Sequence, residues 1–164
     1  MSLEEVKNNL ATCDLCHFRA HEINKGHVPT VGSGGNTIMV CDLAPVDNSE
    51  FLTILEKLGW PVGNTYFTSL LKCKCDKFEP EIAWTCFRSW LSQELVFVNP
   101  LAIISLGTIV DTKLKQFVSW VPIYYLPHYL YIKQNIHLQK EWSNEIKIII
   151  QTIKYETKET MTLY

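Results

Sequence analysis

The sequence predicts a three-layer α/β/α fold with a four-stranded parallel sheet. Short apolar runs alternate along the chain with longer segments of helical spacing, as in the strand and helix repeats that build parallel sheets. The runs at residues 38–40 and 101–106 are mostly apolar and lack alternation, which is typical of strands covered on both faces. With 164 residues, 47% of them hydrophobic, the chain has the size of one domain, so we expect a single domain over residues 1–164.

The predicted fold begins with a helix and a strand. Residues 3–10 carry apolar side chains at helical spacing. Residues 36–41 follow a glycine-rich turn and precede Pro45, and their apolar run predicts the first strand. The chain leaves this strand through a proline turn, at the strand end where α/β proteins usually bind ligands.

A second helix and a second strand follow. Asp47 or Ser49 can cap the helix and Gly59 ends it, because capping side chains start helices and glycine stops them. Residues 65–71 are rich in β-branched and aromatic side chains and predict the second strand.

The same alternation continues to the end of the chain. Pro80 suits the first turn of a helix over residues 80–96. Residues 101–106 predict the third strand, and a helix from about Thr108 follows it.

The last predicted elements are a strand at residues 121–125 and a helix mostly over residues 134–155. Residues 146–150 taken alone would also suit a strand. Because the C-terminal ends of parallel strands meet at one edge of the sheet, we expect ligand chemistry in the loops after Val40, Leu70, Leu106 and Tyr125.

Composition narrows the partners and the compartment. The net charge of -2 gives no overall attraction to nucleic acid, although a local basic groove remains possible. No apolar run approaches the roughly 20 residues that cross a bilayer, and residues 1–5 are too polar for a signal peptide. We therefore expect a cytoplasmic protein without a membrane partner. In that reducing compartment the six cysteines favour metal ligands or free thiols over disulfides.

Five of the cysteines form two groups. Cys13 and Cys16 have Cys-x-x-Cys spacing in a loop. Beyond two predicted strands lie Cys73, Cys75 and Cys86. Four thiolates from two separate segments suit either tetrahedral zinc or a 4Fe–4S cluster, and spacing does not select the metal. Buried free thiols are the alternative.

The order of several motifs resembles the iron–sulfur uracil-DNA glycosylases. The resemblance runs from about Leu3 to the C-terminal helix, which is nearly the whole chain. Its motifs are the Cys-x-x-Cys pair, Val28-Pro29, Ile38-Met39-Val40, Ala44-Pro45, Thr68-Ser69-Leu70-Leu71-Lys72-Cys73, Cys86 and Pro100-Leu101-Ala102-Ile103-Ile104-Ser105-Leu106-Gly107. The resemblance implies a four-stranded parallel sheet with helices on both faces and a DNA groove along the C-terminal strand ends.

The resemblance also implies a cofactor. Matching positions would bind a 4Fe–4S cluster that orders loops near the DNA and carries no electrons; they are Cys13, Cys16, Cys73 and Cys86. Zinc remains the alternative metal. Cys41 and Cys75 match no ligand of the family.

The loop after the first strand departs from the active-site loop of the family. Relatives have Gly-Glu-Ala-Pro-Gly, or Gly-Leu-Ala-Pro followed by a small residue, where this chain has Asp42-Leu43-Ala44-Pro45-Val46. Leu43, Ala44 and Pro45 match the second subtype. Asp42 and Val46 replace glycine or small residues and so narrow the pocket. Asp42 is either a displaced catalytic acid or a carboxylate that caps the loop.

Two further pocket elements of the family are changed. The aromatic lid that stacks on uracil has no counterpart before the helix that contains Phe51, and the helical spacing of Phe51 with Leu55 favours core packing. The asparagine that reads the uracil edge in relatives is Ser69 here. One hydroxyl cannot match the paired donor and acceptor of an amide.

The His-Pro-Ser motif of the family aligns in two ways with this chain. Matching proline to proline places Leu126 at the catalytic histidine and His128 at the serine, without a gap. Matching histidine to histidine keeps His128 as the donor to the uracil carbonyl. Tyr125 and Tyr129 beside it either stack on single-stranded bases or pack against the sheet.

Two other groups of residues have open interpretations. The nearest approach to a basic patch, suited to phosphate contacts or simply to solvent, is Lys72, Lys74, Lys77 and Arg88. The tryptophans that suit either a protein interface or the core are Trp60, Trp120 and Trp142.

These changes favour a DNA-binding protein of uracil-DNA glycosylase-like fold that lacks the activity. Three or four pocket elements are altered, and losing one transition-state donor costs about a hundredfold in rate or more. We expect an accessory subunit of a DNA polymerase or primase in replication or repair, such as that of a phage or mobile element. The alternative is an active uracil-DNA glycosylase of base excision repair, with Asp42 and His128 as candidate catalytic residues.

Overall fold

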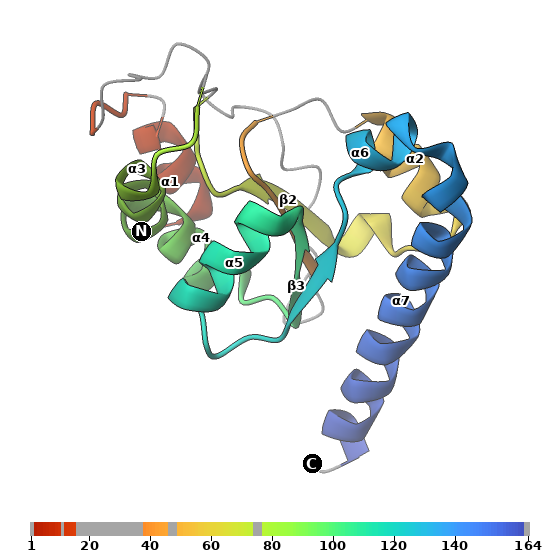
Figure 1. Cartoon of the computed structure of the whole chain (residues 1–164). Coiled ribbons are helices and arrows are strands. Elements are labelled where there is room, and N and C mark those ends of the chain that lie inside the picture. The colour runs from red at the N-terminus through yellow and green to blue at the C-terminus, as the bar shows by residue number, and fades with distance from the viewer. Residues whose placement is uncertain (1, 11, 16–37, 46–48, 74–76, 163–164) are drawn as a thin grey trace.

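Four strands form one parallel sheet between two layers of helices in the computed structural model of the chain (Figure 1). The structure describes residues 2–10, 12–15, 38–45, 49–73 and 77–162, with side chains described as far as Lys154. The strands are β1 (Ile38–Asp42), β2 (Thr65–Ser69), β3 (Ala102–Leu106) and β4 (Ile123–Leu126), and their order is β2-β1-β3-β4. All three strand pairs are parallel, so the predicted α/β/α class is confirmed.

The C-terminal strand ends lie within two residues of their predicted positions. The largest difference is in β2, which ends at Ser69 and not at residue 71. The backbone N–H groups of Leu70 and Leu71 still donate to the carbonyls of Asp42 and Leu43, each over 2.8 Å. The segment after β2 therefore stays beside the loop after β1, at the C-terminal edge of the sheet.

Helices cover both faces of the sheet. They are α1 (Leu3–Leu10), α2 (Ser49–Lys57), η1 (Val62–Asn64), α3 (Pro80–Cys86), η2 (Phe87–Leu91), α4 (Ser92–Val98), α5 (Thr108–Phe117), α6 (Tyr129–Gln134), η3 (Ile136–Leu138) and α7 (Gln139–Thr162). The helix predicted from Pro80 runs on to Val98 through the π-helical turn η2. It ends at Asn99, whose left-handed φ of 47° is a common way to end a helix without glycine.

The C-terminal region differs from the prediction. α7 begins at Gln139 and not at residue 134, which is the last residue of the short helix α6. The strand alternative for residues 146–150 is wrong, because these residues lie inside α7. Their apolar side chains are buried at helical spacing against the sheet: Ile146, Ile149, Ile150 and Ile153. Among the residues that the structure describes, no helix has the length and apolar character needed to cross a membrane.

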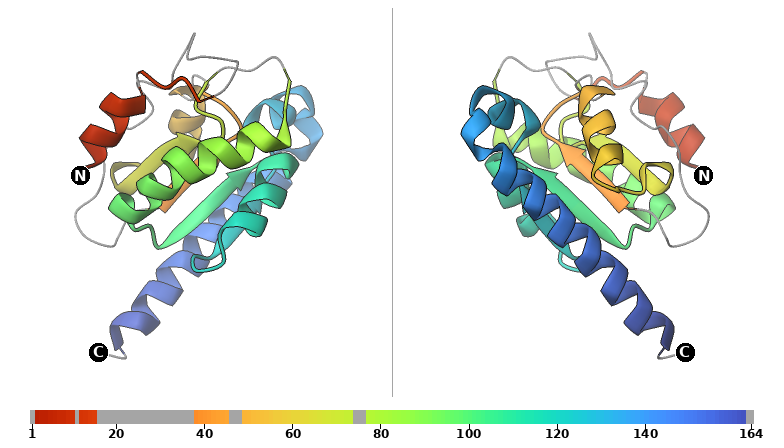
Figure 2. Two further views of the ribbon diagram at one scale, coloured as in Figure 1. Left: turned by 90° about the vertical axis from the view of Figure 1, so that its left-hand side faces the viewer. Right: turned by 90° about the vertical axis from the view of Figure 1, so that its right-hand side faces the viewer.

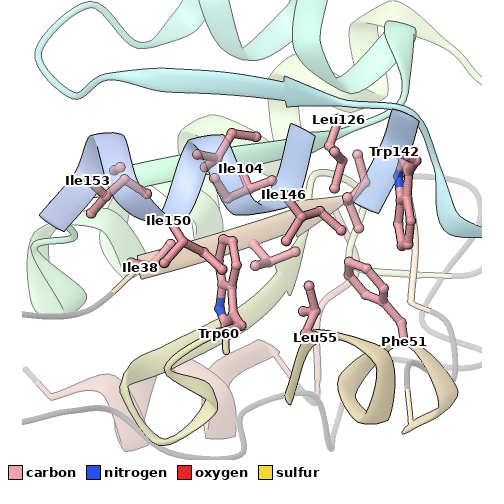
Figure 3. Packing of buried hydrophobic residues seen from close by; sticks show 14 of the residues in the cluster. Ile38, Phe51, Leu55, Trp60, Ile104, Leu126, Trp142, Ile146, Ile150 and Ile153 are labelled. Atoms are coloured by element: carbon pink, nitrogen blue, oxygen red, sulfur yellow. The ribbon is translucent and has the colours of Figure 1, made fainter. Parts of the chain in front are cut away.

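Alternate side chains of each strand enter two separate cores. On one face Val40 and Ile104 pack with α2, α6 and α7. Figure 3 shows this core, with Trp142 of α7 close to Phe51 of α2. On the other face Met39, Tyr66 and Ile103 pack with α3, η2, α4 and α5. In both views of Figure 2, α7 runs past the end of the sheet.

The burial of several aromatic residues shows which of them belong to the core. Phe51 is 3% exposed, so its predicted core packing is confirmed. Trp60 and Trp142 are also buried in the core, whereas Trp120 is 64% exposed.

Candidate functional site

Asp42 and His128 meet at the C-terminal edge of the sheet. Asp42 is the last residue of β1, and His128 follows β4 by two residues as the capping residue of α6. Because the strands are parallel, both loops leave the sheet at the same edge. The His128 Nε2 atom lies 2.9 Å from Oδ2 and 3.1 Å from Oδ1 of Asp42. The two candidate catalytic residues named from the sequence are therefore in direct contact.

Hydrogen bonds determine the tautomer of His128. Its Nδ1 atom accepts the backbone N–H of Leu130 over 3.1 Å, which caps α6. Nδ1 therefore carries a lone pair, and the proton of the neutral ring is on Nε2, which donates to Asp42. Asp42 Oδ1 also accepts the backbone N–H of Leu43 over 2.6 Å. Both ring nitrogens and both carboxylate oxygens have partners.

Asp42 shifts the protonation equilibrium of His128 toward the charged form, relative to a free imidazole. The hydrogen bond to the Asp42 side chain is the largest influence and raises the pKa of His128; partial burial works against this rise, and the negative charge of Asp42 adds to it. The two side chains are 26% and 15% exposed, so the pair is partly shielded from water.

Gly107 follows β3 directly and lies beside His128. Its φ of +94° belongs to the region that favours glycine, and its N–H donates to the Leu126 carbonyl over 2.9 Å. A β-carbon at this position would lie 3.9 Å from the β-carbon of His128. The turn after β3 therefore holds β4 and its following histidine close to the sheet edge.

Four further residues of the predicted pocket, at positions 43–45 and 69, are partly or fully buried. Leu43 and Ala44 are partly buried and pack against the core below α3, and Pro45 is partly buried. Ser69 is 1% exposed, and its hydroxyl donates to the Leu71 carbonyl over 2.6 Å. The serine at the predicted uracil-reading position is thus directed at its own backbone.

The two predicted tyrosines have different surroundings. Tyr129 is partly buried and stacks on Phe51, with ring centroids 5.7 Å apart, so it belongs to the core boundary. Tyr125 is 41% exposed. Leu130 and Tyr131 of α6 are 47% and 53% exposed and were not singled out from the sequence. Ile132 is the one buried residue of α6, so Leu130 and Tyr131 on the other faces of this helix point outward.

No disulfide joins the cysteines that the structure describes. Cys13 follows α1, which packs against α4, while Cys73 and Cys86 are buried after β2 and at the end of α3. Cys16, the fourth predicted ligand, and Cys75 lie outside the described residues. Within the described ranges no group of three or more His, Cys, Asp or Glu side chains could hold a metal ion. The four-cysteine metal site therefore stays a prediction.

Cys41 is distinct from the predicted ligands. It is fully buried in the core under α3, and burial strongly raises the pKa of its thiol. A protonated thiol is a poor metal ligand, because the thiolate is the form that binds metals.

Lys72 is inside the protein and does not belong to a basic surface patch. It is 1% exposed, and its Nζ lies 2.5 Å from Glu94 Oε2 and donates to Thr68 Oγ1 over 2.6 Å. Glu94 Oε1 accepts from the hydroxyls of Tyr66 (2.6 Å) and Thr68 (2.9 Å). Burial and the neighbouring Glu94 raise the pKa of Tyr66. Of the other basic residues considered for a patch, Lys77 and Arg88 are exposed, and Lys74 lies outside the described residues.

No protein-family model matches the chain, and no curated protein matches it either. Functional arguments therefore rest on the geometry of this chain, above all on the Asp42–His128 pair and the exposed side chains around it.

Proposed function

We propose that this chain is a uracil-DNA glycosylase-like protein that binds DNA without excising a base and serves as an accessory subunit of a DNA polymerase or primase. The observation that carries the proposal is the closed hydrogen bonding of Asp42 and His128 at the sheet edge. The parallel sheet with helices on both faces agrees with the fold that the resemblance implies.

Base excision needs groups that are free to act on the substrate. A glycosylase presents a donor to the uracil carbonyl and a group that aligns water or stabilises the sugar cation. Here the Nε2 proton of His128 is donated to Asp42, and its Nδ1 accepts from Leu130. Each group would have to give up an existing partner before it could touch a base, which argues against an efficient enzyme.

In the part of the chain that the structure describes, two elements of a base pocket are altered near the pair. Only residues 43–48 separate β1 from α2, which leaves little chain for an aromatic lid. The Ser69 hydroxyl is buried and bonded to the backbone. At the two described positions compared with the family's lid and uracil-reading amide, Phe51 packs in the core and Ser69 bonds to its own backbone.

Exposed aromatic rings at the same edge support contact with single-stranded DNA. Tyr125 and Tyr131 are exposed on β4 and α6, and aromatic side chains bind unpaired bases by stacking, without sequence preference. The exposed Lys77 and Arg88 suit phosphate contacts. A cytoplasmic location and a structural 4Fe–4S cluster, with zinc as the alternative, are part of the same proposal; the ligands would be Cys13, Cys16, Cys73 and Cys86.

Fluorescence anisotropy with a labelled single-stranded oligonucleotide tests DNA binding. We expect saturable binding that Tyr131→Ala weakens. Trp120→Ala is the matched control, because Trp120 is an equally exposed aromatic residue that precedes β4 and so lies toward the opposite edge of the sheet. Absence of binding, or equal loss in both variants, would refute the DNA contact at this edge.

One observation favours an active glycosylase as the second candidate. The two residues proposed from the sequence as catalytic lie 2.9 Å apart at the edge where ligands bind. Incubation with a uracil-containing single strand, followed by alkali, measures excision as strand cleavage. Cleavage that both Asp42→Asn and His128→Ala abolish would overturn the accessory-subunit proposal.

A further inference from the structure

A pocket of about 280 Å³ opens beside β4, separate from the Asp42–His128 pair. It lies between the end of β4, α6 and the start of α7, and its lining is mostly apolar. The lining residues are Tyr125, Pro127, Ile132, Leu138, Glu141, Trp142 and Glu145. Its volume is below the roughly 300–1,000 Å³ of most small-molecule sites, which suits a single large side chain.

The wall formed by the last residue of η3 and the first turns of α7 has one continuous face. Leu138, Glu141, Trp142 and Glu145 follow the i, i+3, i+4, i+7 spacing of a helix. The indole N–H of Trp142 donates to the Pro127 carbonyl over 3.0 Å, which ties this wall to the chain after β4. The pocket is therefore built from fixed elements and has a defined shape.

Two carboxylates stand at the pocket without a counter-charge. Glu141 and Glu145 are exposed, and within the described part of the chain neither has an ion pair or a hydrogen bond from its side chain. Residues four apart on a helix have β-carbons about 5–6 Å from each other. Lys140 and Lys147 leave α7 at least about 100° away from both glutamates, since each residue turns the helix by about 100°.

The apolar walls and the acidic rim together suit a ligand that is apolar along its length and cationic at one end. A long side chain with an aliphatic stem and a cationic end would bury the stem against Pro127, Ile132 and Leu138 and place its charge at the glutamates. A guanidinium is planar and has five donors, so it can engage two carboxylates at once and also lie on an aromatic face such as Tyr125. A DNA phosphate, by contrast, would be repelled by both glutamates.

We infer that this pocket receives an arginine side chain from a basic segment of a protein partner. The inference differs from the DNA contact proposed above in its class of ligand, and the two surfaces meet at Tyr125. It gives the chain a protein-docking site on the α7 side of the sheet edge, next to the exposed rings of β4 and α6.

The test compares two peptides that differ only in charge. Acetyl-Gly-Arg-Gly-amide and the neutral isostere acetyl-Gly-citrulline-Gly-amide are titrated into the full chain, and the amide resonances of Ile132 and Leu138 and the indole resonance of Trp142 are followed. We expect saturable shifts with the arginine peptide and about tenfold weaker binding of the citrulline peptide, as for the loss of a charge-assisted hydrogen bond.

A pair of charge-matched double variants locates the contact. Glu141→Gln with Glu145→Gln should reduce the affinity for the arginine peptide about tenfold. Glu56→Gln with Glu81→Gln removes the same charge from exposed positions on α2 and α3 and should leave the affinity unchanged. Equal binding of the two peptides, or full affinity after loss of both pocket glutamates, would overturn the inference.

Discussion

The imidazole of His128 donates through Nε2 to the carboxylate of Asp42, across 86 residues of sequence and from the opposite side of β3. This contact joins the loop after β1 to the start of α6. The other ring nitrogen of His128, Nδ1, caps α6 by accepting the Leu130 N–H. One side chain thus fixes the geometry of two loops at the edge where α/β proteins bind ligands.

The first prediction concerns the pKa of His128. Asp42→Asn should lower this pKa, because the hydrogen-bonded carboxylate is what raises it. The imidazole ¹⁵N shifts, followed against pH by NMR, measure the change and also show whether the neutral ring carries its proton on Nε2. Asp111→Asn is the control, since Asp111 pairs with Lys115 and Ser105 and not with His128. An unchanged pKa in Asp42→Asn would contradict the pairing.

The second prediction follows from linkage between protonation and folding. A pKa raised in the folded state means that the pair stabilises the protein fully below the unfolded pKa of about 6.5, and that this contribution is lost as pH rises through the folded pKa. His128→Gln should therefore cost more free energy of unfolding at pH 5.5–6 than at pH 9. Urea denaturation of both proteins at the two pH values provides the comparison. A cost that grows with pH would show that the pair works in the opposite sense.

The sheet could be predicted from the sequence because its signal is local. Mostly apolar runs without alternation, such as residues 38–40 and 101–106, directly predict strands covered on both faces. The α6–α7 boundary could not be predicted in this way, because Tyr129–Gln134 is too short for its periodicity to be separated from that of the helix after it.

The individual residues of the site could be predicted from the sequence, but the contacts between them could not. The resemblance to the glycosylase motifs marks Asp42 and His128 as candidates. Their mutual hydrogen bond depends on the path of two loops, which a local sequence pattern does not determine. The burial of Lys72 was not foreseen either. Its partner Glu94 lies in α4, beyond α3 and η2 along the chain, and lysine is ordinarily a surface residue.

The third prediction concerns the buried ion pair of Lys72 and Glu94. Removing one member leaves a charge without its partner in the core, so Lys72→Met should destabilise the fold by about 3–5 kcal/mol. Adding Glu94→Gln to that variant should recover part of the loss, because it removes the stranded charge. Lys115→Met breaks the more exposed pair with Asp111 and should cost about 1 kcal/mol or less. Urea denaturation measures all three, and equal costs at Lys72 and Lys115 would refute the buried pair.

The fourth prediction concerns the cysteines. Protein purified without oxygen should contain iron and should show a broad visible absorbance. Cys73→Ser or Cys86→Ser should remove both, because each substitution would delete a ligand of the proposed 4Fe–4S cluster. Cys41→Ala is the matched control: this thiol is also buried, but it matches no ligand position of the resembled family, so its loss should leave the metal content unchanged. Elemental analysis separates iron from zinc. Metal content that survives in Cys73→Ser and Cys86→Ser would show that these cysteines are structural thiols and not ligands.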